Sequence, residues 1–428
     1  MLSKIRLNLL GVLCTLFLFT EAQAQSSAST YSALGIGEFN YSGLTHNQGM
    51  GGLGISFGTG WNPNVVNPAL ATRNTIFNFQ AALNYKRINA QTEVETSEVD
   101  GGGLSYIAMS FPFKSGKFGG GLGLNQITSV NYRLVLQSEV RGAEEIAATN
   151  FIQGDGGISE AYVNFGVLVA KNLSLGMTGS YLFGSTIRRN QLTLTNENGN
   201  VVGGRSEYYE RLTVSDVGFK FGAHYFFPIS ENGNLHLGAI YQSLGDVNGT
   251  AFAKLGAFGQ ADDPDTDGDL IANDDPGSVY IPNRFGFGVS YEKANKYVIG
   301  LEGQYQDFNQ YRSFLGEETL LKEAIKIGLG FQIVPDYLSI DNALKRTTYR
   351  FGIEYQQTPY SLNQTNINDL GINFGASFPV NQLSLVNFAM KVGRRGSLEN
   401  GLIREDYINF TLGFSLNDNS WFYKRPFD

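Results

Sequence analysis

Residues 408–416 read Ile-Asn-Phe-Thr-Leu-Gly-Phe-Ser-Leu, so that apolar side chains alternate with Asn, Thr, Gly and Ser. Successive side chains of a β-strand point to opposite faces, and this stretch therefore predicts a strand with one apolar and one polar face. The pattern predicts an all-β protein, because it recurs along most of the chain. Further copies lie at 77–86, 163–169, 217–225, 285–291, 325–333 and 349–355.

The polar face and the length of these strands indicate a membrane protein. The predicted strands run about 10–12 residues, whereas strands of soluble proteins average about 5–6. About ten residues is the length of a tilted strand that crosses a bilayer, with apolar side chains toward lipid and polar ones toward the lumen. The residues predicted to face the lumen include Arg284, Glu302, Lys326, Arg350, Glu354 and Lys391.

The number of strands and the lengths of the connections indicate an antiparallel transmembrane β-barrel. About fourteen strands are predicted, an even number, as single-chain bacterial barrels have. Tight turns at 114–116, 171–172 and 293–295 alternate with long polar segments, and one turn on the short side, 335–347, is longer. Short periplasmic turns and long extracellular loops are typical of outer-membrane barrels. The strands are predicted at 76–87, 103–113, 117–136, 158–170, 173–188, 206–227, 234–245, 283–293, 296–308, 323–334, 348–358, 366–378, 384–394 and 406–416, and the long loops at 88–102, 137–157, 189–205, 246–282, 309–322 and 395–405.

The composition excludes several other classes of protein. The 428 residues carry a net charge of -8, with 16% charged residues, 13% aromatic residues and 53 Gly. A disordered chain has the opposite balance of charged and aromatic residues. The acidic balance also argues against nucleic acid as a partner, because phosphate binding requires clustered basic residues.

The N-terminus predicts export. Residues 1–24 have the features of a secretory signal peptide, with Lys4 and Arg6 before an apolar run at 7–19 and a small-x-small cleavage signal at the end. The alternative, a membrane anchor, is disfavoured because the apolar run is about 13 residues long, too short to span a bilayer. The only cysteine is Cys14, so the mature chain is predicted to lack disulfides and thiolate metal sites. With the strand pattern, these features predict the outer membrane of a bacterial cell.

Residues 25–75 precede the strands and show no comparable alternation. They are small, polar and Gly-rich, with Asn-Pro pairs at 62–63 and 67–68. A fourteen-stranded barrel has a lumen wide enough to hold such a segment. We therefore predict an N-terminal plug at 25–75 and a barrel at 76–416. Residues 417–428 form a C-terminal tail, either packed on the periplasmic rim or docked to a partner.

The plug resembles that of the FadL-type outer-membrane transporters of hydrophobic compounds. The resemblance rests on Gly35-Ile36-Gly37, on the Gly-rich run at 49–54, and on Asn67-Pro68-Ala69 just before the first strand. It implies a fourteen-stranded barrel closed by an N-terminal hatch, and transport of long-chain fatty acids or aromatic hydrocarbons across the outer membrane. Some relatives of this barrel type are instead subunits of outer-membrane secretion or assembly machines. No ligand-pocket residue can be placed from the resemblance.

Two functions therefore remain open. The first is passive uptake of a hydrophobic small molecule from the membrane surface, with Asn67, Pro68 and Ala69 as the hinge of a gate. The second is a non-transporting subunit of a larger envelope complex, which contacts other envelope proteins through its extracellular loops or C-terminal tail. An enzyme is not expected, because an esterase on the outer wall needs a histidine on the lipid face. His224 and His236 are both predicted on the lumen face, roughly opposite each other.

One predicted extracellular loop has the spacing of a calcium site. The spacing is that of calcium-binding loops. Carboxylates stand at the first, third and fifth positions, Gly268 at the sixth, a backbone carbonyl at the seventh and a carboxylate at the twelfth. The last carboxylate is Asp and not the Glu of EF-hands. We predict a structural Ca2+ ion, and the alternative is a solvated acidic loop. The predicted ligands are Asp263, Asp265, Asp267, Asp269 and Asp274.

Overall fold

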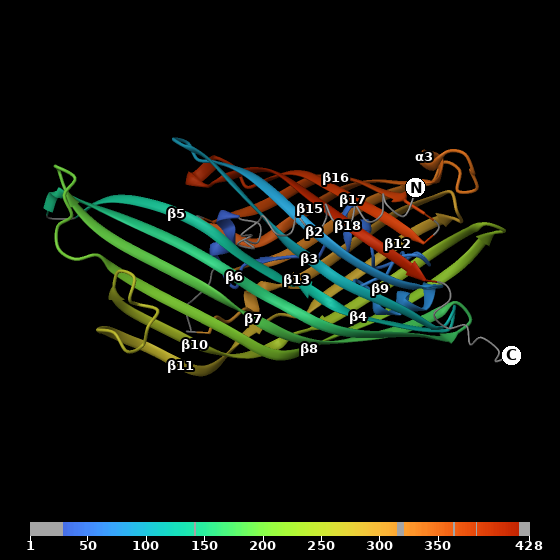
Figure 1. Ribbon diagram of the computed structural model, residues 1–428, viewed down its shortest axis with the longest axis horizontal. Helices are drawn as coiled ribbons and strands as arrows, with labels where there is room; N and C mark the ends of the chain where they lie inside the picture. Colours follow the sequence, from blue (N-terminus) through green and yellow to red (C-terminus); the bar gives the residue numbers. More distant parts are fainter. Residues whose placement is uncertain (1–28, 141–142, 315–320, 363, 382, 419–428) are drawn as a thin grey trace, which may run out of the picture.

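The structure is a computed structural model that describes residues 29–140, 143–314, 321–362, 364–381 and 383–418. The predicted signal peptide at 1–24 and residues 419–428 of the predicted tail lie outside this part. Eighteen strands form one sheet that closes on itself as an antiparallel barrel (Figure 1). The last strand (Arg404–Asp418) pairs with the first strand of the wall (Phe77–Gln91), Phe410 lying opposite Tyr85.

Fourteen strands make the wall, which confirms the predicted number. They are β2 (Phe77–Gln91), β3 (Thr96–Lys114), β4 (Phe118–Gln126), β6 (Ala143–Ala170), β7 (Leu173–Asn196), β8 (Ser206–Ser230), β9 (Gly233–Ser243), β12 (Arg284–Lys293), β13 (Tyr297–Asp307), β14 (Glu323–Ile333), β15 (Thr348–Leu362), β16 (Thr365–Pro379), β17 (Ser384–Arg395) and β18 (Arg404–Asp418). Three further strands, β5 (Thr128–Val140), β10 (Gly245–Ala257) and β11 (Gly268–Ile281), extend the wall beyond β4, β9 and β12.

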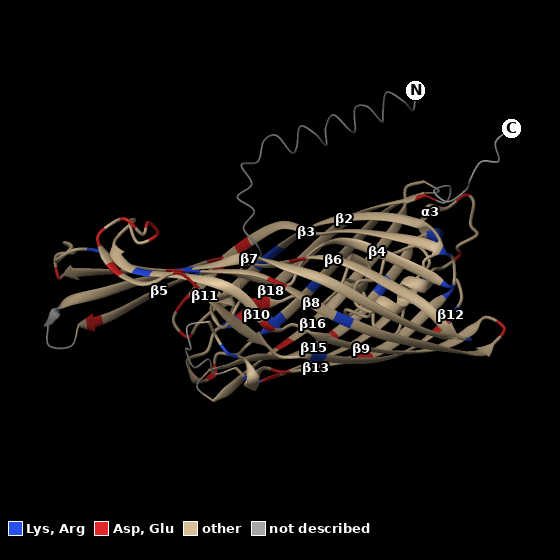
Figure 2. Cartoon of the chain, turned by 90° about the horizontal axis from the view of Figure 1, so that it is seen from below, with Lys and Arg blue, Asp and Glu red and all other residues tan. Residues whose placement is uncertain are grey.

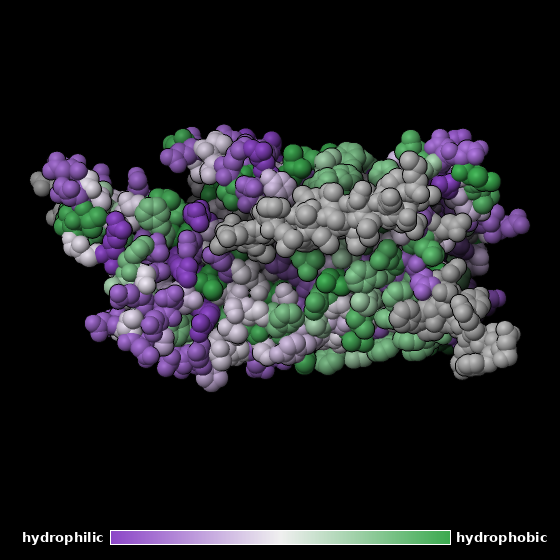
Figure 3. Space-filling model, in the orientation of Figure 1, coloured by the Kyte–Doolittle hydropathy of each residue, from purple (hydrophilic) through white to green (hydrophobic). Residues whose placement is uncertain are grey.

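The two faces of the wall differ as the alternation predicts. On β18, the side chains of Ile408 and Leu416 are 49% and 55% exposed, whereas those of Thr411 and Ser415 are buried. On the face seen in Figure 3, apolar side chains gather over the barrel and hydrophilic ones at the end where β5, β10 and β11 lie. The outer belt is the surface that faces lipid. The predicted lumen residues Arg284, Glu302, Lys326, Arg350 and Glu354 are all buried inside.

The segment before β2 lies inside the barrel (Figure 1). It contains η1 (Thr30–Ala33), the short strand β1 (Glu38–Phe39), α2 (Thr45–Gln48) and η2 (Pro68–Arg73). The helix α2 contacts β16, β17 and β18, and η2 contacts β4, β6, β7 and β8 on another part of the wall. None of the helices in the described ranges is long and apolar enough to cross a membrane.

Three of the predicted long loops are wrong, because most of their residues are in strands. Most of 88–102 belongs to the paired strands β2 and β3. The segment predicted as the loop 246–282 is largely the β10–β11 hairpin, and most of 137–157 belongs to β5 and β6. These strands extend past the rim of the barrel as a curved sheet (Figure 1). No lipid faces a sheet outside the membrane, so its sequence does not need the apolar alternation that marks the belt. The predicted long turn 335–347 is confirmed and carries α3 (Ala343–Arg346).

Candidate functional site

The plug lies directly against the backbone of the wall, because glycine occupies the wall positions at the contacts. A Cβ atom added to any of ten wall glycines would lie 2.0–2.8 Å from the nearest plug atom. Real Cβ contacts are never so short, so no larger residue fits unless the plug moves. Strand glycines therefore allow close approach of the plug. The ten glycines lie on nine strands: Gly119, Gly166, Gly176, Gly222, Gly238, Gly300, Gly328, Gly330, Gly352 and Gly375.

The Asn-Pro-Ala motif anchors the plug to β8. Asn67 is fully buried, and its Nδ2 donates to the carbonyl oxygens of Ile55 at 2.6 Å and Ala223 at 3.0 Å. Its Oδ1 accepts the N–H of Ala69 at 3.0 Å, which caps η2, and Pro68 occupies the first position of that helix. The structure therefore brings the three predicted residues together at a fixed contact. Their role as a hinge stays a prediction.

A buried carboxylate on the wall holds the middle of the plug. Glu302 of β13 accepts the consecutive N–H groups of Gly54, Ile55 and Ser56 at 2.7–2.9 Å and the hydroxyl of Ser56 at 2.8 Å. Successive N–H groups that converge on one anion form an anion-binding nest, which satisfies a carboxylate away from water. Sequence patterning placed Glu302 in the lumen but gave no sign of this partner.

Glu38 of β1 joins the plug to a network of charged residues on the wall. Its carboxylate lies 3.0 Å from Lys86 and 2.5 Å from Arg395. Burial alone would raise the pKa of Glu38, but the charges of Arg395 and Lys86 outweigh burial and hold the pKa below its ordinary value. Four cations thus face four carboxylates. The other pairs are Lys326–Glu354 at 3.2 Å, Lys391–Glu354 at 2.7 Å, Lys391–Asp369 at 3.4 Å, Arg395–Asp369 at 2.9 Å and Arg395–Glu405 at 3.8 Å.

The wall is interrupted between β3 and β5. The β3–β4 ladder ends where Tyr106 lies opposite Asn125, and among the described residues no ladder joins the rest of β3 to β5. The plug strand β1 pairs with β5 at this place instead, with Phe39 opposite Thr128. Figure 1 shows the β2–β3 hairpin and β5 diverging toward this end of the barrel. The plug thus covers a lateral gap in the wall.

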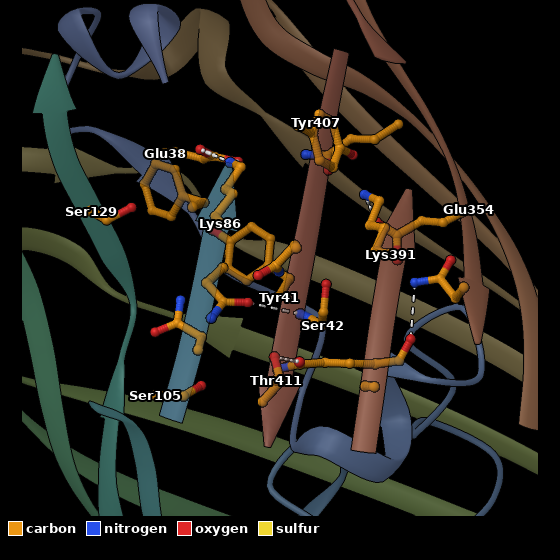
Figure 4. A pocket seen from close by; sticks show the side chains of 18 of the residues that line it. Glu38, Tyr41, Ser42, Lys86, Ser105, Ser129, Glu354, Lys391, Tyr407 and Thr411 are labelled. Atoms are coloured by element: carbon orange, nitrogen blue, oxygen red, sulfur yellow. Dashed lines mark hydrogen bonds and ion pairs between the residues drawn. The ribbon is translucent and has the colours of Figure 1, made fainter. Parts of the chain in front are cut away.

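Behind β1 lies a small polar cavity of about 100 Å3 (Figure 4). Glu38 and Lys86 lie at one end and Lys391 and Glu354 at the other, with Tyr41 between them. Ligand pockets usually measure about 300–1,000 Å3 and are mostly apolar. This cavity therefore has room for a few water molecules and is too small for a hydrophobic ligand.

An apolar layer covers the plug on the side of the long loops. Tyr31 and Ile36 of the plug pack with Leu182 and Leu244 of the wall segments and with Tyr360 of β15 in one buried cluster. Leu34, Phe39, Phe314 and Ile403 pack against this cluster and are partly buried. Apolar side chains thus pack against Phe39 of β1, the strand that covers the gap.

The predicted calcium ligands do not converge. In the described part of the chain, no three His, Cys, Asp or Glu residues form a group that could hold a metal ion. Asp274 pairs with Arg211 at 3.1 Å. The buried Nζ of Lys254 donates to the carbonyl oxygens of Asp263 at 2.7 Å and Thr266 at 2.5 Å, so a protein cation already lies among these oxygens. Calcium binding stays a prediction that requires the loop to rearrange.

The two strand histidines form a pair, as predicted. His224 Nε2 lies 3.1 Å from His236 Nδ1 on the neighbouring strand. A carboxylate joins the pair, because His236 Nε2 lies 3.0 Å from Glu292. Glu292 also pairs with Arg73 at the end of η2, at 2.9 Å. The cluster is thus another contact between wall and plug.

A comparison with family models places the chain. The model described as BamG matches residues 1–428, the whole chain. The chain belongs to the BamG family. Among curated proteins, no sequence match is found.

Solved structures show the fold of this BamG family member. The P. putida toluene transporter TodX is 16% identical, with a TM-score of 0.55 over 90% of this chain and 99% of that one. The CymD monoaromatic hydrocarbon channel is 14% identical, with a TM-score of 0.55 over 89% and 99%. A Pseudomonas aeruginosa FadL homologue is 12% identical, with a TM-score of 0.53 over 90% and 99%. The FadL-type architecture is therefore confirmed, and none of these three proteins is described as an enzyme.

Proposed function

We propose that the chain is an outer-membrane channel for passive uptake of hydrophobic small molecules such as long-chain fatty acids. The lateral gap between β3 and β5, covered by β1, carries the proposal. A straight path through the barrel would have to displace the plug from nine glycine-bearing strands. A path through the gap requires only β1 and its neighbours to move. The solved structures of similar fold support the proposal, since two are titled as a toluene transporter and a hydrocarbon channel.

The energies of ligand binding and gate opening are comparable. A ligand that buries about 300 Å2 of apolar surface in the layer above the plug gains roughly 7 kcal/mol. Opening of the gap breaks the pairing of β1 with β5 and the two ion pairs of Glu38. Breaking a buried pair costs about 3–5 kcal/mol. A bound ligand can therefore offset the displacement of β1, and the gate stays closed without ligand.

Uptake by reconstituted protein tests this function. Liposomes that contain the full chain should take up a radiolabelled long-chain fatty acid or toluene faster than empty liposomes. Ligand would be assayed inside the vesicles by trapping, because hydrophobic compounds also partition into the bilayer. A rate equal to that of empty liposomes would contradict the proposal.

A second candidate is a non-transporting subunit of a larger outer-membrane assembly or secretion complex. The close contacts between the plug and the wall glycines favour this candidate, because a lumen filled so tightly is compatible with a purely structural barrel. The sheet that extends past the rim offers a contact surface. It carries exposed apolar side chains at Val135, Leu136, Leu270 and Ile271.

Gentle extraction separates the two candidates. The native protein would be solubilised in mild detergent, sized, and the peak examined by mass spectrometry. One chain with bound lipid or hydrocarbon supports the channel. A much larger particle with stoichiometric partner proteins and no ligand supports the subunit.

A further inference from the structure

A second, larger cavity lies at the opposite end of the lumen from the long loops. It measures about 1380 Å3 and lies between the plug segment 57–75 and the short turns at 115–116, 171–172 and 295–296. The turn that carries α3 forms another side, where Ile340 is 89% exposed. We call this cavity the vestibule. It faces the side that the short turns assign to the periplasm.

The vestibule is strongly basic, although the whole chain has a net charge of -8. Six cationic residues and one carboxylate, Glu292, line it. Glu292 is already shared between Arg73 at 2.9 Å and His236 at 3.0 Å. Figure 2 shows Lys and Arg at the end of the barrel near α3. The six cations are Arg73, Lys171, Lys293, Lys296, Arg346 and Arg350.

Arg350 is the decisive residue, because it is buried without a counter-ion. Its side chain lines the vestibule, and the residue is 6% exposed. The guanidinium donates to Gln332 Oε1 at 2.8 Å and Ser377 Oγ at 2.6 Å, both neutral groups. Within the described ranges no carboxylate pairs with it, whereas Arg395 of the Glu38 network has three such partners. A buried charge is normally paired, so the site is prepared for an anion.

The rest of the lining is aromatic and apolar, which a simple inorganic anion does not need. Phe57, Trp61 and Tyr297 line the cavity, and Trp61 is 53% exposed. Aromatic side chains beside guanidinium and ammonium groups suit a peptide with both carboxylate and apolar side chains. A lipid headgroup fits less well, because the vestibule lies within the wall and beneath the plug, away from the bilayer.

We propose that the vestibule binds an acidic peptide segment of a periplasmic partner protein. Its carboxylates would lie on Arg350 and on the lysines of the rim, and its apolar side chains on Trp61 and Tyr297. The site would serve a channel and a complex subunit alike, and it requires neither of the functions above.

The test uses the full chain in detergent and a fluorescein-labelled peptide that alternates Glu with Leu, followed by fluorescence anisotropy. We expect saturable binding that weakens as salt is raised. Arg350→Gln should weaken binding at least tenfold. Arg394→Gln is the matched control, because Arg394 is 62% exposed, pairs with Asp406 and lies outside the vestibule. It should leave the affinity unchanged.

Two further measurements distinguish a loss of peptide binding from a folding defect in Arg350→Gln. The double variant Lys293→Gln/Lys296→Gln alters the last residue of β12 and a residue of the turn that follows, both at the rim, and should weaken binding several-fold in a normally folded barrel. In a Trp421→Phe background, which leaves Trp61 as the only tryptophan, the peptide should change the emission. The proposal is wrong if the peptide does not saturate, if a Gln-Leu peptide binds equally well, or if both vestibule variants keep the wild-type affinity. Full competition by inorganic phosphate or by phosphatidylglycerol vesicles would also overturn it, in favour of a phosphate or headgroup site.

Discussion

A Cβ atom at position 222 of β8 would lie 2.0 Å from Oδ1 of Asn67, so the plug meets the wall here only while residue 222 is glycine. The same amide donates to Ala223 O at 3.0 Å. Contacts of this kind on nine strands explain why the plug has one position in the lumen. The lateral gap at β1 lies outside these glycine contacts, and this difference is the basis of the proposed gate.

Gly222→Ala should loosen the plug. The added methyl group forces Asn67 or β8 to shift, and overpacking costs about 1–3 kcal/mol. We expect a lower melting temperature and faster proteolysis within residues 29–75. Gly179→Ala on β7 is the matched control, because a Cβ there meets no atom within 4 Å. Equal behaviour of the two variants would contradict the seating role of Gly222.

Glu38→Gln should release β1 from the wall. It leaves Lys86 and Arg395 without the plug carboxylate, and removal of one partner of a buried pair costs about 3–5 kcal/mol. Hydrogen exchange at residues 36–42 should become faster. Glu98→Gln breaks an exposed pair with Arg87 and should change stability by less than about 1 kcal/mol. Unchanged exchange at β1 would show that the Glu38 pairs do not hold the gate.

The same variant predicts a pH dependence. The pKa of Glu38 is held below its ordinary value, so its ionised form stabilises the fold at neutral pH and this contribution is lost as pH falls. The difference in stability between wild type and Glu38→Gln should stay constant from pH 7 to about 5 and narrow below about pH 4. Thermal unfolding at several pH values measures it. A difference in stability between the two proteins that grows as pH falls would contradict this prediction.

Lys254→Met should destabilise the β10–β11 hairpin. The buried ammonium group donates to Asp263 O, Thr266 O and Thr266 Oγ1, and a hydrogen bond to a charged group contributes about 1.5–3 kcal/mol. Hydrogen exchange of residues 252–270 should become faster while the barrel strands keep their protection. Lys322→Met, an exposed lysine outside the hairpin, should show no change. Normal protection in Lys254→Met would mean that the lysine does not organise this loop.

The calcium prediction has its own measurement. Binding of millimolar Ca2+ would stabilise the folded state by RT ln(1 + [Ca2+]/Kd) and would therefore raise the melting temperature. Asp267→Asn would remove the effect. A calorimetric titration without heat, and a melting temperature independent of Ca2+, would contradict calcium binding by residues 263–274.

The sequence predicted the parts of the fold that the bilayer dictates. Lipid on one side and a polar lumen on the other impose strict alternation, which is why β18 and the pair of His224 and His236 could be placed. The β10–β11 hairpin lacks that alternation because no lipid faces it, and its burial is irregular, the consecutive residues Phe252 and Ala253 both being buried. The contacts of Glu302 and the lateral gap depend on which distant segments pack together, and a local sequence pattern does not predict such packing.

The most direct test of the proposed function fixes β1 across the gap. Phe39 and Thr128 are paired across β1 and β5, and the only native cysteine, Cys14, lies in the predicted signal peptide. A Phe39→Cys/Thr128→Cys variant would therefore form one defined disulfide, with Val392→Cys/Ile408→Cys on β17 and β18 as the wall control. Uptake of a labelled long-chain fatty acid into proteoliposomes should fall at least tenfold when the first pair is oxidised and return on reduction, and the control pair should have no effect. Equal uptake by the oxidised and reduced forms would contradict the lateral gate.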